Sequence, residues 1–273
     1  MTAAPRDAKP VTVRDFLARK RSGQRLVVVS AYDALFARLA DEAGVDAILV
    51  GDSLGNVLLG YESTLPVTLE QMIHHGKAAR RGTSRALLVV DMPFLTYQVS
   101  VEDAMRNCGR VMQETGAQAV KMEGGSLPIA AAARAVVALG VPVMGHLGFT
   151  PQAVHALGGY RVQAREADGA DRLVDDARRL EDAGCFAIVL ELVPAEVAAH
   201  VTDAVGVPTI GIGAGPRCDG QVLVLSDLLG LDDRATRKFL KRYAQLGDEV
   251  RRAVREFGDD VREGRFPDAE HSF

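Results

Sequence analysis

Ala47 to Gly60, with the sequence AILVGDSLGNVLLG, is the stretch that decides the fold. Its first four residues form a short apolar run, which predicts a fully buried strand. The run breaks at Gly51, and a carboxylate and a hydroxyl follow at once in Asp52 and Ser53. Because ligands of α/β proteins bind at the carboxyl ends of parallel strands, these two side chains stand where a site is expected.

The same arrangement recurs along the chain. Short apolar runs predict eight strands, at residues 26–30, 47–50, 86–90, 119–122, 143–145, 187–190, 209–212 and 221–225. Helical patterns alternate with these runs, and the alternation indicates parallel strands joined by right-handed crossovers. Eight such units in roughly 250 residues fit a (β/α)8 TIM barrel.

Extra helices are expected at both ends of the barrel, at residues 13–20 and from about 232 to 263. We expect residues 1–273 to form a single domain. The alternative fold is an open, doubly wound sheet, which is disfavoured because no GxGxxG sequence opens a helix after the first strand. The longest irregular stretch, residues 147–168, has a length that is typical of functional loops.

Composition limits the classes of protein to consider. The 273 residues are 48% hydrophobic and 25% charged, with a net charge of −4. No basic cluster indicates nucleic-acid binding, and no apolar run approaches the ~18 residues of a membrane span. The first ten residues, MTAAPRDAKP, lack the apolar core of a signal peptide. Three widely spaced cysteines argue against a disulfide framework or a zinc cluster, so we expect a cytoplasmic protein.

Ionisable side chains follow five consecutive predicted strands. They are Asp52, Asp91, Glu123, His146 and Glu191. Strands of one parallel barrel end on a single face, so these side chains could converge. Four carboxylates in one pocket repel each other, and the offsetting charge could come from a metal or from Lys121, which shares a strand face with Glu123. Oxygen ligands with one histidine and no thiolate favour Mg²⁺ or Mn²⁺ over Zn²⁺.

Simpler interpretations remain open for the single residues. A carboxylate after a strand often only caps the next helix, His146 could be a structural histidine, and Ser53 could only cap a turn. Lys121 is harder to explain in this way, because an unpaired ammonium inside an apolar run is costly to bury. A common site accounts for the whole set better than several unrelated caps do.

Several phrases occur in order from about residue 27 to the C-terminus. They are GDSLG at 51–55, STLPVT at 63–68, DMPF at 91–94, KMEGG at 121–125, GHLG at 145–148, TPQ at 150–152, LELVP at 190–194, IGIGAG at 210–215, DGQ at 219–221 and EHSF at 270–273. Each phrase is weak alone, but the ordered set resembles the ketopantoate hydroxymethyltransferase family. Asn56 stands where that family usually has Met, and Phe149 where it usually has Leu.

The resemblance implies a (β/α)8 barrel of the phosphoenolpyruvate/pyruvate superfamily. It also implies an enzyme that transfers a hydroxymethyl group from 5,10-methylenetetrahydrofolate to 3-methyl-2-oxobutanoate. The products would be 2-dehydropantoate, a precursor in pantothenate and coenzyme A biosynthesis, and tetrahydrofolate. The small-molecule partners would be the oxo acid and the folate, the cofactor Mg²⁺, and the assembly a homo-oligomer, commonly a decamer.

Site roles follow from the resemblance residue by residue. Metal ligands would be Asp52 and Asp91, with Glu123 a third ligand, direct or through water. The substrate would lie against these two aspartates and against Ser53, Lys121 and His146. Of these, Ser53 and Lys121 would hold its carboxylate and oxo oxygens, and His146 would line the pocket near the reacting carbons. The catalytic base would be Glu191.

Two alternatives are weighed against this activity. A Mg²⁺-dependent C–C lyase of the same superfamily would carry an acidic cysteine on a flexible loop. Cys108 and Cys185 instead fall within or at the end of predicted helices, and Cys218 falls in an unrelated turn. A barrel without enzymatic activity, binding only a metabolite or a metal, would be favoured by a missing acid in the set, and none is missing.

Overall fold

The computed structural model describes residues 9–232 and 237–273, and the chain forms two compact units. The first unit spans Met1–Leu223 and the second spans Val224–Phe273. The expectation of a single domain over residues 1–273 stays a prediction. Most of the MTAAPRDAKP segment lies outside the described residues.

Eight parallel strands close into a barrel in the order in which they occur in the chain. The strands are β1 Leu26–Ser30, β2 Ala47–Val50, β3 Leu87–Asp91, β4 Ala119–Glu123, β5 Val143–Gly148, β6 Ala187–Glu191, β7 Thr209–Ile212 and β8 Gly220–Val224. Sequence and structure agree on the bounds of β1, β2 and β7, and the other strands are shifted or extended by one to three residues. The barrel prediction is confirmed, and the doubly wound alternative is wrong because the sheet closes.

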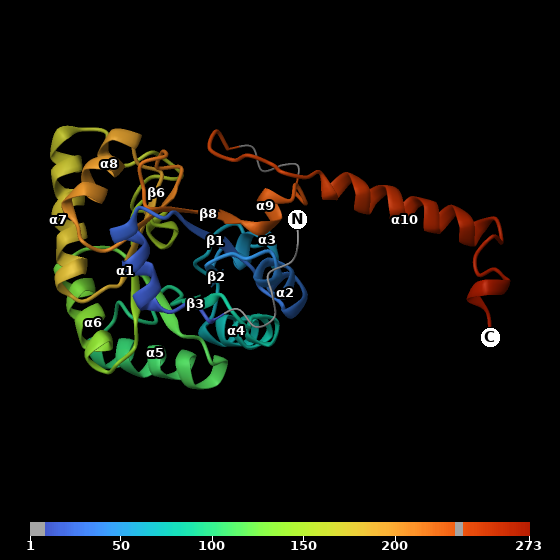
Figure 1. The fold of residues 1–273 in the computed structure, drawn as a ribbon, viewed down its shortest axis with the longest axis horizontal. Helices are drawn as coiled ribbons and strands as arrows, with labels where there is room; N and C mark the ends of the chain where they lie inside the picture. Colours follow the sequence, from blue (N-terminus) through green and yellow to red (C-terminus); the bar gives the residue numbers. More distant parts are fainter. Residues whose placement is uncertain (1–8, 233–236) are drawn as a thin grey trace. The chain divides into compact units, whose positions relative to one another are not determined.

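Helices cover the outside of the strands, as Figure 1 shows for α4 to α8. The helices of the first unit are α1 Val13–Ser22, α2 Ala34–Glu42, α3 Leu54–Val57, α4 Leu69–Gly82, α5 Val101–Thr115, α6 Leu127–Ala138, η1 Pro151–Ala153, α7 Ala167–Asp182 and α8 Ala195–Ala204. Side-chain caps start three of these helices. The Asp33 carboxylate accepts from Phe36, Thr68 and Gln71 form a capping box, and the Ser100 hydroxyl accepts from Asp103.

The strict alternation of strand and helix fails between β7 and β8. Residues 213–219, all described, contain no helix, although β7 and β8 pair in parallel. Two glycines with positive φ, Gly213 at 63° and Gly215 at 78°, turn this short link. A Cβ at Gly215 would lie 2.4 Å from the Cβ of Ala195 at the start of α8, so the link passes too close to that helix for any side chain.

The interior of the barrel follows the two-residue period of its strands. Alternate residues of the strands belong to one buried apolar cluster, for example Leu87 and Val89 on β3 and Ala187 and Val189 on β6. Phe16 of α1 also joins this cluster. The next inward position after the apolar ones on several strands carries an ionisable group, which places the site on top of the core.

The second unit contains less helix than the helices expected from about residue 232 to 263. It contains α9 Leu225–Leu228, α10 Leu246–Arg262 and the short η2 Ala269–His271. Within the expected span, residues 233–236 lie outside the described ranges and 237–245 are not helical. In the segment before α10, the Tyr243 N–H donates to the Leu228 carbonyl. The N–H groups of Leu246 and Gly247, in the first turn of α10, donate to the carbonyls of Leu229 and Gly230, which satisfies donors that have no partner within the helix.

One face of α10 exposes large apolar side chains. They are Val250, Val254, Phe257 and Val261, which follow one another at intervals of three and four residues. Among the described residues, no helix is both long and apolar enough to cross a membrane.

Asp41, near the end of α2, ties that helix to the entrance of β3. Its carboxylate accepts from the N–H groups of Ser84 (3.1 Å), Arg85 (3.1 Å) and Ala86 (2.6 Å), and from the Ser84 hydroxyl (2.7 Å). Asp41 is 5% exposed. One buried carboxylate thus satisfies three successive backbone donors that would otherwise lack a partner.

Asp41→Ala is expected to lower the free energy of unfolding by roughly 2–4 kcal/mol, because it leaves buried backbone donors unpaired. Urea denaturation followed by circular dichroism measures this. Glu42→Ala is the matched control, since the Glu42 carboxylate is exposed and lies 3.5 Å from Arg38. It should cost less than about 1 kcal/mol. Equal losses in the two variants would contradict the role of Asp41.

The loss of stability caused by Asp41→Ala should also depend on pH. Burial raises the pKa of Asp41, but hydrogen bonds from Ala86, Ser84 and Arg85 outweigh it and hold the pKa below the ordinary 3.8. A carboxylate with a depressed folded-state pKa stabilises the fold above its unfolded-state pKa and loses that contribution as the pH falls through the folded value. The difference between wild type and Asp41→Ala should therefore stay constant near neutrality and shrink below about pH 4.

Candidate functional site

The ionisable side chains expected at the strand ends meet at one end of the barrel interior. Each is at most 8% exposed, and the set comprises Asp52, Asp91, Lys121, Glu123, His146 and Glu191. Strand periodicity explains why they share one space. Asp91 lies two residues after the inward-facing Val89, and Glu191 lies two residues after Val189. Their convergence, which the sequence predicts, is therefore confirmed as geometry.

The ion pair between Asp91 and Lys121 follows from strand register. These two residues are direct partners on the neighbouring strands β3 and β4, so their side chains leave the sheet side by side. Asp91 Oδ1 lies 2.8 Å from Lys121 Nζ, and each side chain is 4% exposed. The buried lysine therefore has the partner that its burial requires.

Asp52 is held next to this pair. Its backbone N–H donates to Asp91 Oδ2 at 3.0 Å. A Cβ at the preceding Gly51 would lie 2.7 Å from Ser53 Oγ and 3.4 Å from Asp91 Oδ2. Glycine at this position therefore allows the chain to turn close against the carboxylate of the next strand.

Three further groups form a row across β4, β5 and β6. Glu123 and His146 are register partners, and Glu123 Oε1 lies 3.4 Å from His146 Nδ1. Nδ1 also lies 3.2 Å from Lys121 Nζ. The other ring nitrogen, Nε2, lies 3.3 Å from Glu191 Oε2. His146 thus stands between Glu191 and the remaining charged groups.

Burial and mutual charge shift several of these groups away from their ordinary protonation. Burial raises the pKa of Asp52 well above its usual range, and the charges of Glu123 and Asp91 add to the shift. Burial also raises the pKa of Asp91, against the opposing effect of Lys121. A cluster of this kind favours an added cation, because a positive charge stabilises the ionised carboxylates.

Burial lowers the pKa of the basic groups, but the neighbouring carboxylates outweigh burial and raise it. Burial lowers the pKa of Lys121, but the carboxylates of Asp91, Glu123 and Asp52 outweigh this and raise it. Burial and the Lys121 charge lower the pKa of His146, but its contacts with Glu123 and Glu191 raise it to about 9. For Glu123, burial raises the pKa, and the contacts with His146 and Lys121 reverse this to a net lowering.

Ser53 lies at the edge of the same space and is partly buried. It occupies the N-cap position of α3, yet its side chain makes no capping hydrogen bond there. Instead its hydroxyl lies 2.9 Å from the Tyr32 hydroxyl, which lies 2.9 Å from Ser30 Oγ at the end of β1. The alternative in which Ser53 only caps a turn is therefore not supported by its contacts.

The helix-cap alternative also fails for the carboxylates. The N-cap residues of the described helices that follow β2 to β6 are Ser53, Thr68, Ser100, Ser126, Thr150, Glu166 and Pro194. Asp52, Asp91, Glu123 and Glu191 are absent from that set. Their burial at the strand ends therefore needs another explanation than capping.

Sequence reasoning gave no role to two further residues of the site, Gln152 and Tyr97. Gln152 is 7% exposed, and its side-chain Nε2 donates to Asp52 Oδ2 at 2.9 Å. Tyr97 is 1% exposed, and its hydroxyl accepts from the Glu123 N–H at 3.0 Å. Two signals could have found Gln152, namely the TPQ phrase at 150–152 and its place in a long irregular stretch after a strand.

The donor set fits a magnesium ion. Mg²⁺ is usually bound by one or two carboxylates together with water and substrate oxygens. Asp52 and Asp91, whose ionised forms burial disfavours, could supply two such oxygens. Among the described residues, no group of three or more His, Cys, Asp and Glu side chains is arranged as a metal site. The residues therefore fit a Mg²⁺ site with two protein carboxylates and further oxygens from water or substrate, rather than a site in which protein side chains supply every ligand.

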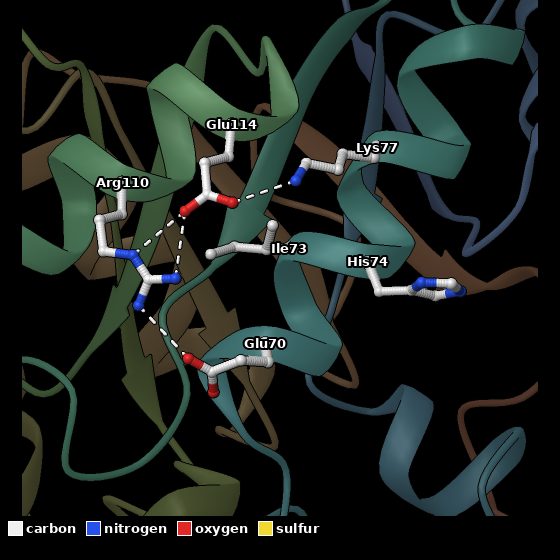
Figure 2. Close-up of a pocket in the computed structure, with 6 residues that line it drawn as sticks. All are labelled: Glu70, Ile73, His74, Lys77, Arg110 and Glu114. Carbon is white, nitrogen blue, oxygen red and sulfur yellow. Dashed lines mark hydrogen bonds and ion pairs between the residues drawn. The ribbon is translucent and has the colours of Figure 1, made fainter.

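A separate pocket of about 250 Å³ lies between α4 and α5 and contains none of the predicted site residues. Figure 2 shows its charged side chains paired with one another. Glu114 lies 3.0 Å from Lys77 and 3.1 Å from Arg110, and Arg110 lies 3.3 Å from Glu70. Exposed pairs of this kind contribute little and leave no charge directed at a ligand.

Comparison with known proteins assigns the family. A model of the ketopantoate hydroxymethyltransferase family matches residues 10–269. The chain belongs to the ketopantoate hydroxymethyltransferase family. Similar relatives are named 3-methyl-2-oxobutanoate hydroxymethyltransferase. The one from Oleidesulfovibrio alaskensis is 55% identical over 98% of this chain and 92% of its own length. The one from Moorella thermoacetica is 55% identical over 96% of this chain and 97% of its own.

Solved structures of other proteins resemble this chain in fold. A phosphonopyruvate hydrolase in complex with oxalate and Mg²⁺ matches with a TM-score of 0.61 at 15% identity, over 96% of this chain and 93% of that one. A 2,3-dimethylmalate lyase of the PEP mutase/isocitrate lyase superfamily matches with a TM-score of 0.58 at 16% identity, over 95% and 91%. The predicted family is confirmed, and the likeness to these structures agrees with the barrel fold.

Proposed function

We propose that this chain transfers a hydroxymethyl group from 5,10-methylenetetrahydrofolate to 3-methyl-2-oxobutanoate, giving 2-dehydropantoate and tetrahydrofolate. The name shared by its relatives supports this activity. The observation that carries the proposal is the position of Glu191. Its carboxylate lies at the end of β6, 3.3 Å from His146 Nε2, whereas the Glu123 carboxylate lies 3.4 Å from the other ring nitrogen, Nδ1. The His146 ring thus lies between Glu191 and the neighbouring buried acid, Glu123.

Asp52 and Asp91 would hold Mg²⁺, with Glu123 acting through water. The Glu123 carboxylate already accepts from the Gln152 N–H at 3.0 Å and faces His146, which supports an indirect role. When bound, Mg²⁺ would polarise the 2-oxo and carboxylate oxygens of the substrate and make its C3 proton more acidic.

The remaining residues would orient the substrate. Lys121, buried and positively charged, would attract the oxo and carboxylate oxygens, and the Ser53 hydroxyl would donate a hydrogen bond to them. Both groups are held in place, Lys121 by Asp91 and Ser53 by Tyr32. Fixed donors near the developing negative charge lower the barrier without needing to reorganise.

Glu191 would remove the C3 proton as the general base. The resulting enolate would attack the methylene carbon supplied by the folate, forming the new C–C bond. Both C–N bonds of that carbon would break, one water would supply the hydroxyl oxygen of the product, and the two folate nitrogens would gain the C3 proton and one proton of the water. His146, whose Nε2 lies 3.3 Å from Glu191 Oε2, would keep that carboxylate oriented and line the pocket beside the reacting carbons. A positioned base of this kind usually contributes about 10²–10⁴-fold to the rate.

The lyase alternative loses support because no described cysteine is placed as an acid. Cys108, Cys185 and Cys218 are free and buried. Burial raises the pKa of the Cys108 and Cys185 thiols to about 12, so both are poor proton donors. Free thiols are also consistent with the reducing cytoplasm that we propose for this chain.

Loss of a metal ligand gives the first test. Asp52→Ala and Asp91→Ala should each weaken Mg²⁺ binding at least about tenfold, because two carboxylates are all that the site offers directly. Isothermal titration calorimetry with MgCl₂ measures this, and circular dichroism checks that each variant is folded. Asp171→Ala, at an exposed position of α7, is the control. Wild-type affinity in both site variants would sink the ligand assignment.

Glu191→Gln tests the base separately from the metal. The amide keeps the size of the side chain but cannot accept the proton, so turnover should fall by roughly 10²–10⁴-fold while Mg²⁺ binding persists. Exchange of the C3 proton of 3-methyl-2-oxobutanoate with D₂O, followed by NMR without folate, isolates the first step. Glu196→Gln, exposed on α8, is the matched control. Exchange at the wild-type rate in Glu191→Gln would exclude it as the base.

We also propose a homo-oligomer, by family resemblance a decamer. The apolar face of α10 supports this, because Val254 and Phe257 are 64% and 55% exposed in the single chain. Val254→Asp should shift the mass measured by multi-angle light scattering at micromolar concentration toward smaller species. Arg255→Asp, next to it in the sequence, is the control. A wild-type monomer would refute the assembly.

A further inference from the structure

The side chain of Gln152 makes four hydrogen bonds inside the site. Its Nε2 donates to Asp52 Oδ2 and to the carbonyl of Met92, both at 2.9 Å. Its Oε1 accepts from the Tyr97 hydroxyl at 2.8 Å and from Gln98 Nε2 at 2.9 Å. Both hydrogens and both lone pairs of the amide are therefore used.

These contacts permit only one orientation of the amide. A rotation by 180° would place the Gln152 oxygen against the Asp52 carboxylate and the Met92 carbonyl, and its NH₂ group against that of Gln98. Each of these encounters joins two acceptors or two donors. Since Gln152 is 7% exposed, little water can replace the lost bonds. The Asp52 carboxylate consequently always faces a donor.

The backbone of the same residue reaches a second carboxylate. Gln152 N donates to Glu123 Oε2 at 3.0 Å. Pro151 begins the one-turn helix η1 and fixes the chain direction directly after β5. Tyr97 joins the two halves of the arrangement, because its hydroxyl accepts from the Glu123 N–H and contacts Gln152 Oε1. Asp52, which follows β2, and Glu123, on β4, are thus held by one residue of the β5–α7 connection.

We propose that Gln152 is a positioning residue that presents the Asp52 and Glu123 carboxylates to the divalent cation. The inference rests on the proposed function, in which Asp52 is a ligand and Glu123 acts through water. One Asp52 oxygen is occupied by the amide, which leaves the other for the cation. Partners that orient a ligand in this way typically contribute 10–100-fold to metal affinity.

Gln152→Met is the sharpest test, because methionine keeps the length of the side chain and removes both donors and the acceptor. The Mg²⁺ dissociation constant, measured by calorimetry without substrate, should rise about 10–100-fold. Gln118→Met is the matched control. Its Oε1 accepts from Leu88 N at 2.9 Å, and Gln118 lies directly before β4, so it loses a comparable bond at the other end of the barrel. That variant should bind Mg²⁺ like the wild type.

Tyr97→Phe keeps the proposal testable if Gln152→Met does not fold. It removes the hydroxyl that orients the amide but leaves Gln152 in place, so a smaller rise, about 3–10-fold, is expected. A kinetic signature should accompany both variants. The Mg²⁺ concentration for half-maximal activity should rise more than kcat at saturating Mg²⁺ falls, which a general loss of stability would not produce.

The outcomes separate the two proposals. If the wild type binds Mg²⁺ and Asp52→Ala does not, the metal assignment stands. Unchanged affinity in Gln152→Met, or in Tyr97→Phe where Gln152→Met does not fold, then overturns only the positioning role. A similar loss in Gln118→Met would overturn it as well, because the effect would be one of stability. If the wild type binds no Mg²⁺, both proposals fall.

Discussion

The two-residue period of a parallel strand is the constraint on which this site depends. In the barrel it directs alternate side chains inward, first apolar ones such as Val89 and Val189, then Asp91 and Glu191. Strand register then decides which charges meet. Asp91 faces Lys121 and Glu123 faces His146, because each pair occupies matching positions on neighbouring strands. These charged residues form a polar layer that occupies the next inward positions after the apolar core residues of the same strands.

Charge balance sets the second condition. Acids buried on an apolar core are costly unless cations or hydrogen-bond donors stabilise them. Lys121 and His146 supply part of the positive charge, and the Gln152 amide supplies donors. The raised pKa of Asp52 indicates that this compensation is incomplete at one point. An additional cation at that point would complete it, which is the physical reason for placing Mg²⁺ beside Asp52 and Asp91.

Much of the fold and of the site follows from local patterns in the sequence. Apolar runs located all eight strands, and the first charged residue after several of them identified the convergent side chains. Contacts between distant segments were out of reach, because no periodicity encodes them. Gln152 meets Asp52 across 100 positions of the chain, and Tyr97 reaches Glu123 from a loop. The contact before α10 is of the same kind, since the Tyr243 N–H donates to the Leu228 carbonyl. The helix-free link at 213–219 needs glycines whose positive φ no pattern of hydrophobicity reveals.

The all-parallel order of the barrel has a consequence for the way the chain folds. Parallel neighbours cannot be joined by a tight hairpin, so each pairing closes a long loop, as between the register partners Val90 on β3 and Val120 on β4. Contacts of such high sequence separation slow folding, because their loop entropy is lost before they form. A carboxylate that is buried before the neighbouring strand has docked would lack the cation or hydrogen-bond donor that stabilises its charge. We therefore expect successive β–α units to assemble before the charges at the top are sealed from water, with the polar layer forming late in the folding of the chain.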